Sequence, residues 1–154
     1  MDKISKSLCG VSGEYFVAAE LSRRGFIASL TLRNSKGIDI LVANEEATKT
    51  IGIQVKTNQN SNRSWVLSIK NEKYNSDNLV YIFVNLNGIS EMPNYYIVSS
   101  KDVSKFIKHN HQNWLSSPNK KGGDHNDNPI RKFSDLEGAY HNKWDIIQQK
   151  LYKG

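Results

Sequence analysis

Three polar residues on two neighbouring apolar stretches are the first place in this chain where chemistry can be expected. Residues 37–42 and 51–57 alternate between apolar and polar positions, which is the period of a β-strand. Gln54 and Lys56 are two positions apart, so they share one face of the second strand. Asp39 lies opposite the apolar positions of the first strand. If the two strands pair antiparallel, Asp39, Gln54 and Lys56 converge, and an acid, an amide oxygen and a cation meet.

This spacing resembles the active-site motif of the PD-(D/E)xK nuclease superfamily, in which an acidic residue is followed by (D/E)-x-K on the next strand. The matching residues here are Asp39, Gln54 and Lys56. Ile38 stands where the name of the superfamily has Pro, and Gln54 stands where an acid is usual. A D…Q-x-K version is familiar from the restriction-like branch of the superfamily. Glutamine brings no negative charge to a metal ion, so a weak metal site is expected.

The segment before these strands extends the resemblance. Residues 13–26 resemble the N-terminal helix of archaeal Holliday-junction resolvases, which carries a catalytic Glu well before a Gly-Phe exit into the first strand. The sequence predicts a helix from Ser12, as the N-cap, to about Arg24. Glu14 matches the catalytic acid, and Glu20 is the second choice. The alternative explanation of Glu14 is electrostatic, because the first turn of a helix favours an anion.

The resemblance implies a role for each of these residues. Hydrolysis of a phosphodiester needs oxygen ligands for a hard divalent cation, an activated water and compensation of the charge that builds on the phosphate. The resemblance assigns the metal, Mg²⁺ or Mn²⁺, to Asp39, Gln54 and the backbone carbonyl of Val55. It puts Glu14 in contact with the metal through water. It implies that Lys56 orients the attacking water or stabilises the charged transition state.

Five further residues are candidates for contact with nucleic acid. Ser35 and Lys36 lie in the connector that runs beside the scissile phosphate in the superfamily. Lys120 and Lys121, together with Arg131, could form a basic patch on phosphates. Solvated turns and surface charge explain these residues as well. A net charge of +6 and a pI near 9.4 favour a polyanionic partner, although only modestly.

Length and composition indicate a single domain over residues 1–154. No apolar run approaches about 20 residues, so no membrane span is expected. The N-terminus lacks the apolar core of a signal peptide. Cys9 is the only cysteine, which excludes an internal disulfide and makes a zinc site improbable. These features favour a cytoplasmic protein.

The order of the elements predicts an α/β fold with a central mixed sheet flanked by helices, as in restriction-endonuclease-like proteins. Residues 79–84 form a continuous apolar run that suits a strand buried on both faces. The sequence His109-Asn110-His111 spells HNH, but it falls at the end of a predicted helix, so the match is accidental. Further strands are expected at 26–32, 64–70 and 94–98, a helix at 99–109, and a long loop at 116–129.

The C-terminus carries the pattern of an amphipathic helix. Residues 134–137 read Ser-Asp-Leu-Glu, which is a capping box. The predicted helix then presents one apolar stripe to the core: Tyr140, Trp144, Ile147 and Leu151.

The sequence and its resemblance therefore predict a metal-dependent nuclease that hydrolyses phosphodiester bonds. The expected reaction is endonucleolytic cleavage of DNA. A catalytically inactive nucleic-acid-binding module of the same fold is the main alternative. An interaction subunit without a nucleic-acid role is a third. The oligomeric state stays open, a homodimer included.

Overall fold

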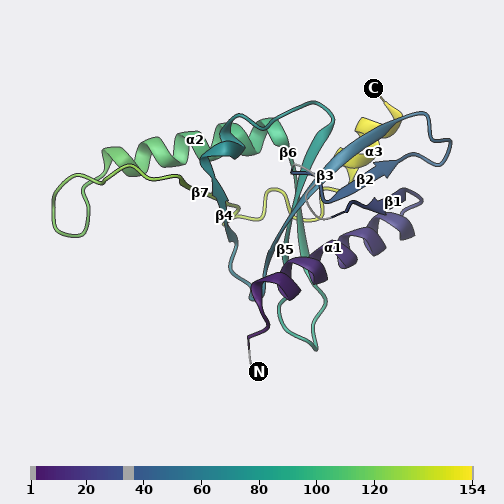
Figure 1. Cartoon of the computed structure of the whole chain (residues 1–154), viewed down its shortest axis with the longest axis horizontal. Coiled ribbons are helices and arrows are strands. Elements are labelled where there is room, and N and C mark those ends of the chain that lie inside the picture. Colours follow the sequence, from purple (N-terminus) through teal and green to yellow (C-terminus); the bar gives the residue numbers. More distant parts are fainter. Residues whose placement is uncertain (1–2, 33–36, 154) are drawn as a thin grey trace.

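The computed structural model describes residues 3–32 and 37–153. Five strands form a mixed sheet in the order β1-β2-β3-β5-β6, and β4 pairs with β7 in a separate ribbon (Figure 1). Strands β3 and β5 are parallel, and the other neighbours are antiparallel. In chain order the elements are α1 (Lys6–Arg23), β1 (Ile27–Leu30), β2 (Ile40–Ala43), β3 (Thr50–Asn58), β4 (Ser64–Ser68), the 3₁₀ turn η1 (Ile69–Glu72), β5 (Leu79–Asn85), β6 (Asn94–Ser99), α2 (Ser100–Ser116), β7 (Ile130–Ser134) and α3 (Asp145–Tyr152).

Strand β5 shows why the sheet must be covered on both faces. All of its residues are buried, as the continuous apolar run predicts, and its side chains alternate between two hydrophobic clusters. Val80 and Ile82 pack in the cluster that contains apolar side chains of α1 and α3. Tyr81 and Phe83 pack in the cluster that contains those of α2, β4 and β7. Helices α1 and α3 therefore cover one face, and α2 with the β4–β7 ribbon covers the other.

Helix α1 begins earlier than the sequence pattern predicts. Its N-cap is Ser5, whose Oγ accepts the backbone N–H of Leu8 at 3.2 Å. The predicted cap at Ser12 is wrong, and Glu14 lies in the middle of the helix instead of its first turn. Dipole stabilisation at the helix N-terminus therefore does not explain Glu14. The residues that set the buried side of α1 recur every four positions: Cys9, Gly13, Val17 and Leu21.

The predicted capping box at residues 134–137 is also wrong. Ser134 ends β7, a strand that the sequence analysis missed, and Asp135 closes a turn instead. The carboxylate of Asp135 accepts the backbone N–H groups of Ala139 and Tyr140 at 2.8 and 2.9 Å. Helix α3 starts at Asp145, so Tyr140 is not on it and packs against the α2 side of the sheet.

The other elements are close to expectation. Trp144, Ile147 and Leu151 are buried against the α1 side, as their spacing predicts. Ser99 caps α2 by accepting the backbone N–H of Asp102 at 3.1 Å, and the helix then runs seven residues past its predicted end at 109 to Ser116. Within residues 3–32 and 37–153, no helix has the length and apolar character needed to cross a bilayer.

Close packing of α1 on β3 leads to the first prediction. A Cβ on Gly13 would lie 1.9 Å from Thr57 Oγ1 and 2.9 Å from Thr57 Cβ, so the helix rests directly on the strand. Gly13→Ala should push the helix away and lower the free energy of unfolding by about 1–3 kcal/mol. Gly10→Ala is the matched control on the same helix, because a Cβ at Gly10 meets nothing within 4 Å. There the better helix former should raise stability by about 0.5–1 kcal/mol. Urea unfolding measures both, and equal effects would refute the contact.

Candidate active site

The candidate site lies where β2 and β3 separate. Pairing between them ends at Ile40 and Ile53, whereas β3 stays paired with β5 as far as Asn58. Among the described residues, 54–58 of β3 therefore have no strand partner on the β2 side. Backbone groups alternate in direction along a strand, so Val55 turns its N–H and carbonyl toward this open edge. Asp39 fills the gap, since its Oδ2 accepts the N–H of Val55 at 2.7 Å.

Asp39 is reached by a bend just before β2. Its own N–H donates to the carbonyl of Ile53 at 2.8 Å, one residue out of register with the β2–β3 ladder. Ile38, expected to share a face with Ile40, packs instead on the α2 side of the sheet. The bend explains this difference, because strict alternation holds only within a regular strand. Burial raises the pKa of Asp39, and the Val55 hydrogen bond and the charge of Lys56 oppose that rise.

Gln54 lies next to this acid, and a neighbouring amide fixes its orientation. Asn71, in η1, accepts the backbone N–H of Ser68 on its Oδ1 at 2.9 Å, so its Nδ2 must point the other way. That Nδ2 donates to Gln54 Oε1 at 3.3 Å and to the hydroxyl of Tyr81 at 2.9 Å. The amide oxygen of Gln54 therefore faces Asn71, and it keeps a second lone pair for another partner. Burial raises the pKa of Tyr81 to about 12, which keeps it neutral.

Lys56 lies on the same face of β3 as Gln54. Both line a hollow of about 590 Å³ between β3 and η1. Two exposed lysines of the η1 region, Lys70 and Lys73, stand on the same wall. No Asp or Glu of the described chain is among the residues that line this hollow. It is therefore a concave, positively charged surface beside a half-buried carboxylate.

Comparison with known proteins identifies this architecture. No protein-family model and no curated protein sequence gives a significant match. Hjc, a Holliday junction resolvase from the archaeal hyperthermophile Archaeoglobus fulgidus, aligns over 85% of this chain and 86% of its own, with a TM-score of 0.47 and 13% identity. The bacterial homing endonuclease I-Ssp6803I aligns over 95% of this chain and 94% of its own, with a TM-score of 0.53 and 15% identity. The chain has a restriction-endonuclease-like fold. The predicted fold class is thus confirmed.

Within the restriction-endonuclease-like fold, Asp39, Gln54 and Lys56 lie at one fork of the sheet. Helix α1 covers the opposite face from Gln54, and Glu14 is not among the residues that line the Gln54–Lys56 hollow. Glu14 does follow Gly13, which touches Thr57, so its turn of α1 lies beside β3 one residue beyond Lys56. Glu20, the second choice, is bonded to Arg23 and Arg24 at the helix end.

The predicted phosphate contacts separate into three groups. Ser35 and Lys36 lie outside the described residues. Lys120 and Lys121 are exposed in the loop after α2, which forms the tip at the far left of Figure 1, away from β3. Arg131 is buried, 4% exposed, where it forms an ion pair with Glu72 and donates to the carbonyl of Asn128 at 2.7 Å. Arg131 therefore holds β7 to η1 and does not offer its charge to a ligand, contrary to the prediction.

The donor set at the fork suits a hard divalent cation only modestly. Asp39 supplies one carboxylate, and Gln54 and the carbonyl of Val55 supply neutral oxygens. No group of three or more His, Cys, Asp or Glu side chains placed to hold a metal occurs in residues 3–32 and 37–153. Burial raises the pKa of Asp39 by more than the Val55 hydrogen bond and the charge of Lys56 lower it, so its charged form lacks full compensation. A cation at this point would relieve that deficit, so the residues fit a weakly held divalent ion.

Sequence reasoning missed the residues contributed by η1. Asn71, which orients Gln54, and the lysines Lys70 and Lys73 come from a polar segment that carries no motif. A partial signal exists, because Ser68 and Asn71 have the spacing of an N-cap and its N3 partner. Nothing in the sequence shows that this short turn faces β3, since that contact depends on how the chain folds between β4 and β5.

The buried carboxylate predicts a pH-dependent stability. Because the folded-state pKa of Asp39 is raised, its stabilising contribution is present below its unfolded pKa and is lost as pH rises through the folded pKa. Asp39→Asn removes the buried charge and keeps an oxygen for the Val55 N–H. In EDTA the variant should melt above the wild type at neutral pH, and the difference should shrink as the pH approaches about 4.

The control is the same substitution at an exposed acid. A hydrogen bond from Lys101 lowers the pKa of Asp77, so its contribution is present at neutral pH and is lost on acidification. Asp77→Asn should therefore melt slightly below the wild type at neutral pH. Thermal melts across the pH range compare the two. A lower melting temperature for Asp39→Asn at neutral pH would contradict the site as described.

Proposed function

We propose that this protein is a metal-dependent nuclease that hydrolyses phosphodiester bonds, with DNA as substrate. The observation that supports the proposal is the fork of the sheet, where Asp39, Gln54 and Lys56 meet beside an open strand edge. The lysine-lined hollow next to it suits a polyanionic substrate. The restriction-endonuclease-like fold, shared with a homing endonuclease, supports the same reading.

The proposal gives each residue a role. Asp39, Gln54 and the carbonyl of Val55 would hold a divalent ion, which supplies Lewis-acid activation of the phosphate and of water. Lys56 offers a proton donor and a positive charge where negative charge develops on the phosphate. Lys70 and Lys73 attract the neighbouring phosphates of the strand. Asn71 is a positioning residue, because its amide holds the oxygen of Gln54 in one orientation.

A catalytically inactive nucleic-acid-binding module is the second candidate. One observation favours it: the acid usual at position 54 is replaced by Gln. The lysines of the hollow would still bind phosphates in such a module. The two candidates therefore differ in bond cleavage, and nucleic-acid binding is common to both.

Cleavage assays separate the candidates. The protein should cut at least one of linear duplex, single-stranded or branched DNA in Mg²⁺ or Mn²⁺ and none in EDTA, with RNA included for comparison. Lys56→Ala should lower the rate by about a hundredfold or more, because it removes charge stabilisation of the transition state. Lys105→Ala, on the exposed side of α2, removes the same charge outside the hollow and should leave the rate unchanged.

Two results would count against the nuclease. Salt-sensitive DNA binding without divalent-dependent cleavage would assign the chain to the inactive module. Equal loss of activity in Lys56→Ala and Lys105→Ala would attribute the lysine effect to general charge.

The neutral ligand at position 54 yields a further prediction. Gln54→Glu keeps the side-chain length and still accepts the hydrogen bond of Asn71, but it adds a second negative charge beside Asp39. Mn²⁺ or Mg²⁺ should bind more tightly, because ligand charge adds directly to the attraction. In EDTA the two carboxylates should repel each other and lower the melting temperature at neutral pH. Calorimetry and thermal melts measure the two effects.

The matched control is Gln112→Glu on the exposed surface of α2, which makes the same charge change away from the fork. Its melting temperature should not respond to divalent ions any more than that of the wild type. If Gln54→Glu behaves like this control, and Asp39→Asn is also indifferent to metal, the fork holds no cation.

A further inference from the structure

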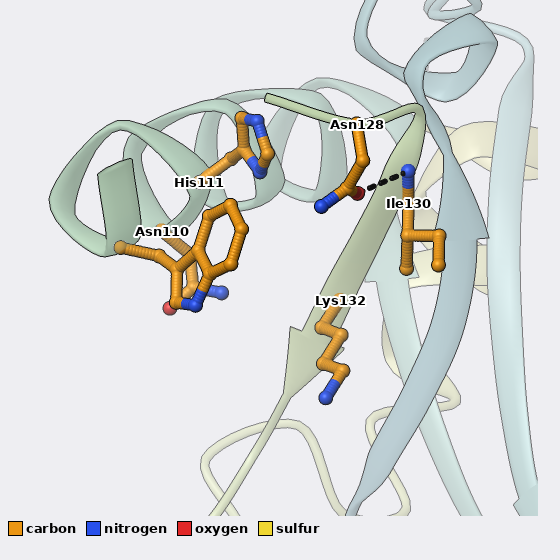
Figure 2. Close-up of a pocket in the computed structure, with 6 residues that line it drawn as sticks. Asn110, His111, Asn128, Ile130 and Lys132 are labelled. Atoms are coloured by element: carbon orange, nitrogen blue, oxygen red, sulfur yellow. Dashed lines mark hydrogen bonds between the residues drawn. The ribbon is translucent and has the colours of Figure 1, made fainter. Parts of the chain in front are cut away.

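A second concave site lies on the other side of the ribbon from the fork, between α2 and β7 (Figure 2). It is a pocket of about 290 Å³. The residues that line it are Asn110, His111, Trp114, Asn128, Ile130 and Lys132. None of these residues takes part in the proposed cleavage site, and the nuclease motif does not include them.

The wall of this pocket is aromatic and held in place. The ring of Trp114 stacks with His111 at 5.4 Å and lies 4.0 Å from the ring of His125, centroid to centroid. His111 is buried, and its Nε2 lies 2.7 Å from Oδ1 of Asp127. Trp114 itself is partly exposed. Because these contacts fix the indole in advance, a planar ligand can pack against it at little cost in entropy.

The polar groups of the pocket include hydrogen-bond donors. Asn128 accepts the backbone N–H of Ile130 on its Oδ1 at 2.9 Å, so its NH₂ is turned away from Ile130 and toward the pocket (Figure 2). Lys132 is exposed and brings a positive charge, and Asn110 adds a second amide. No described Asp or Glu is among the lining residues. The combination suits a ligand that is planar, rich in hydrogen-bond acceptors and negatively charged.

The pocket is connected to the fork by the outer face of the ribbon. Lys132 pairs across the ribbon with Val66, which is 64% exposed. Val66 lines a shallow hollow that Lys56 and Lys6 also line. Val66 therefore lies between the hollow that Lys56 lines and Lys132 of the pocket. A nucleic-acid strand lying at the fork can follow this face of the ribbon without leaving the surface.

We infer that the pocket between α2 and β7 binds a nucleotide, with the base against Trp114 and the phosphate at Lys132. An aromatic wall beside a cation is the combination that binds single-stranded nucleic acid. If a strand that also reaches the fork supplies this nucleotide, its base must be unpaired. Only an extruded or single-stranded base exposes its face to an aromatic side chain. The claim that a strand bound at the fork supplies the nucleotide rests on the proposed function. The claim that the pocket binds a nucleotide does not.

The sharpest test changes one atom of the pocket. Asn128→Asp keeps the oxygen that accepts the Ile130 N–H and replaces the NH₂ that faces the pocket with a negative oxygen. Asn126→Asp is the matched control, because it makes the same charge change in the same exposed loop outside the pocket. Binding of a labelled oligothymidylate is measured by fluorescence anisotropy in EDTA, so that cleavage does not enter. Asn128→Asp should weaken binding about fivefold or more, and Asn126→Asp about twofold or less.

A second pair of variants guards against a disturbed loop. Lys132→Gln, on β7, should weaken oligothymidylate binding more than Lys105→Gln on α2, although both remove one exposed positive charge. Trp114→Ala should weaken it by about 5- to 150-fold, and Trp114→Phe should recover part of the loss because a ring is restored. Equal effects within both charge-matched pairs would overturn the inference, since general electrostatics would then account for binding.

The remaining arms identify the source of the nucleotide. A duplex of the same sequence should bind without the difference between Asn128→Asp and Asn126→Asp, because its bases are stacked. Thymidine monophosphate is tested as a competitor of the labelled oligothymidylate. If it competes as strongly as unlabelled oligothymidylate, the ligand of the pocket is a free nucleotide. If the matched pairs show no pocket-specific effect while the wild type cleaves DNA in Mn²⁺, this inference alone fails. If they show that effect and the wild type does not cleave, the proposed nuclease alone fails.

Discussion

The structure depends on one constraint: β3 is longer than β2, its antiparallel neighbour in the sheet. Five residues of β3, 54–58, extend past the last β2 partner, so their backbone groups on that side need other partners. Asp39 accepts the N–H of Val55, and the thiol of Cys9 on α1 lies 3.7 Å from the carbonyl of Thr57. The open edge thereby draws an acid and a helix toward the same short segment. The candidate site is a consequence of how this edge is satisfied.

The same constraint explains which parts of the site the sequence predicts. Alternation fixes Gln54 and Lys56 on one strand face, and the hairpin brings Asp39 beside them, because these are local relations. The place of Glu14 on α1 depends on where the helix starts, and the observed cap, Ser5, lies seven residues before Ser12. Asn71 and the η1 lysines depend on a long-range contact that no spacing encodes. Arg131 looks like a surface charge in the sequence, yet its partner Glu72 is 59 positions away.

The fold itself was more predictable than the site. The apolar run 79–84 requires cover on both faces, and that requirement alone implies helices or a second layer on each side. The β4–β7 ribbon was only half predicted, because β7 contains Arg131 and Lys132 and alternates too briefly to stand out. The end of the chain was misjudged for a related reason. Ser134 has the sequence of a helix cap, but it ends β7, and the carboxylate of Asp135 closes a turn with Ala139 and Tyr140.

Glutamine at position 54 changes the electrostatic balance at the fork. Asp39 is already a carboxylate whose burial raises its pKa, so a second acid at this point would add repulsion whenever no cation is present. An amide held by Asn71 keeps an oxygen ligand in the same place without that repulsion. The fork is then more stable when empty and less attractive to a cation. The surrounding lysines act in the same direction, since positive charges favour an anion over a free metal ion. In the proposed nuclease, the metal would bind together with the nucleic acid, because the phosphate oxygens would supply the negative charge that position 54 lacks.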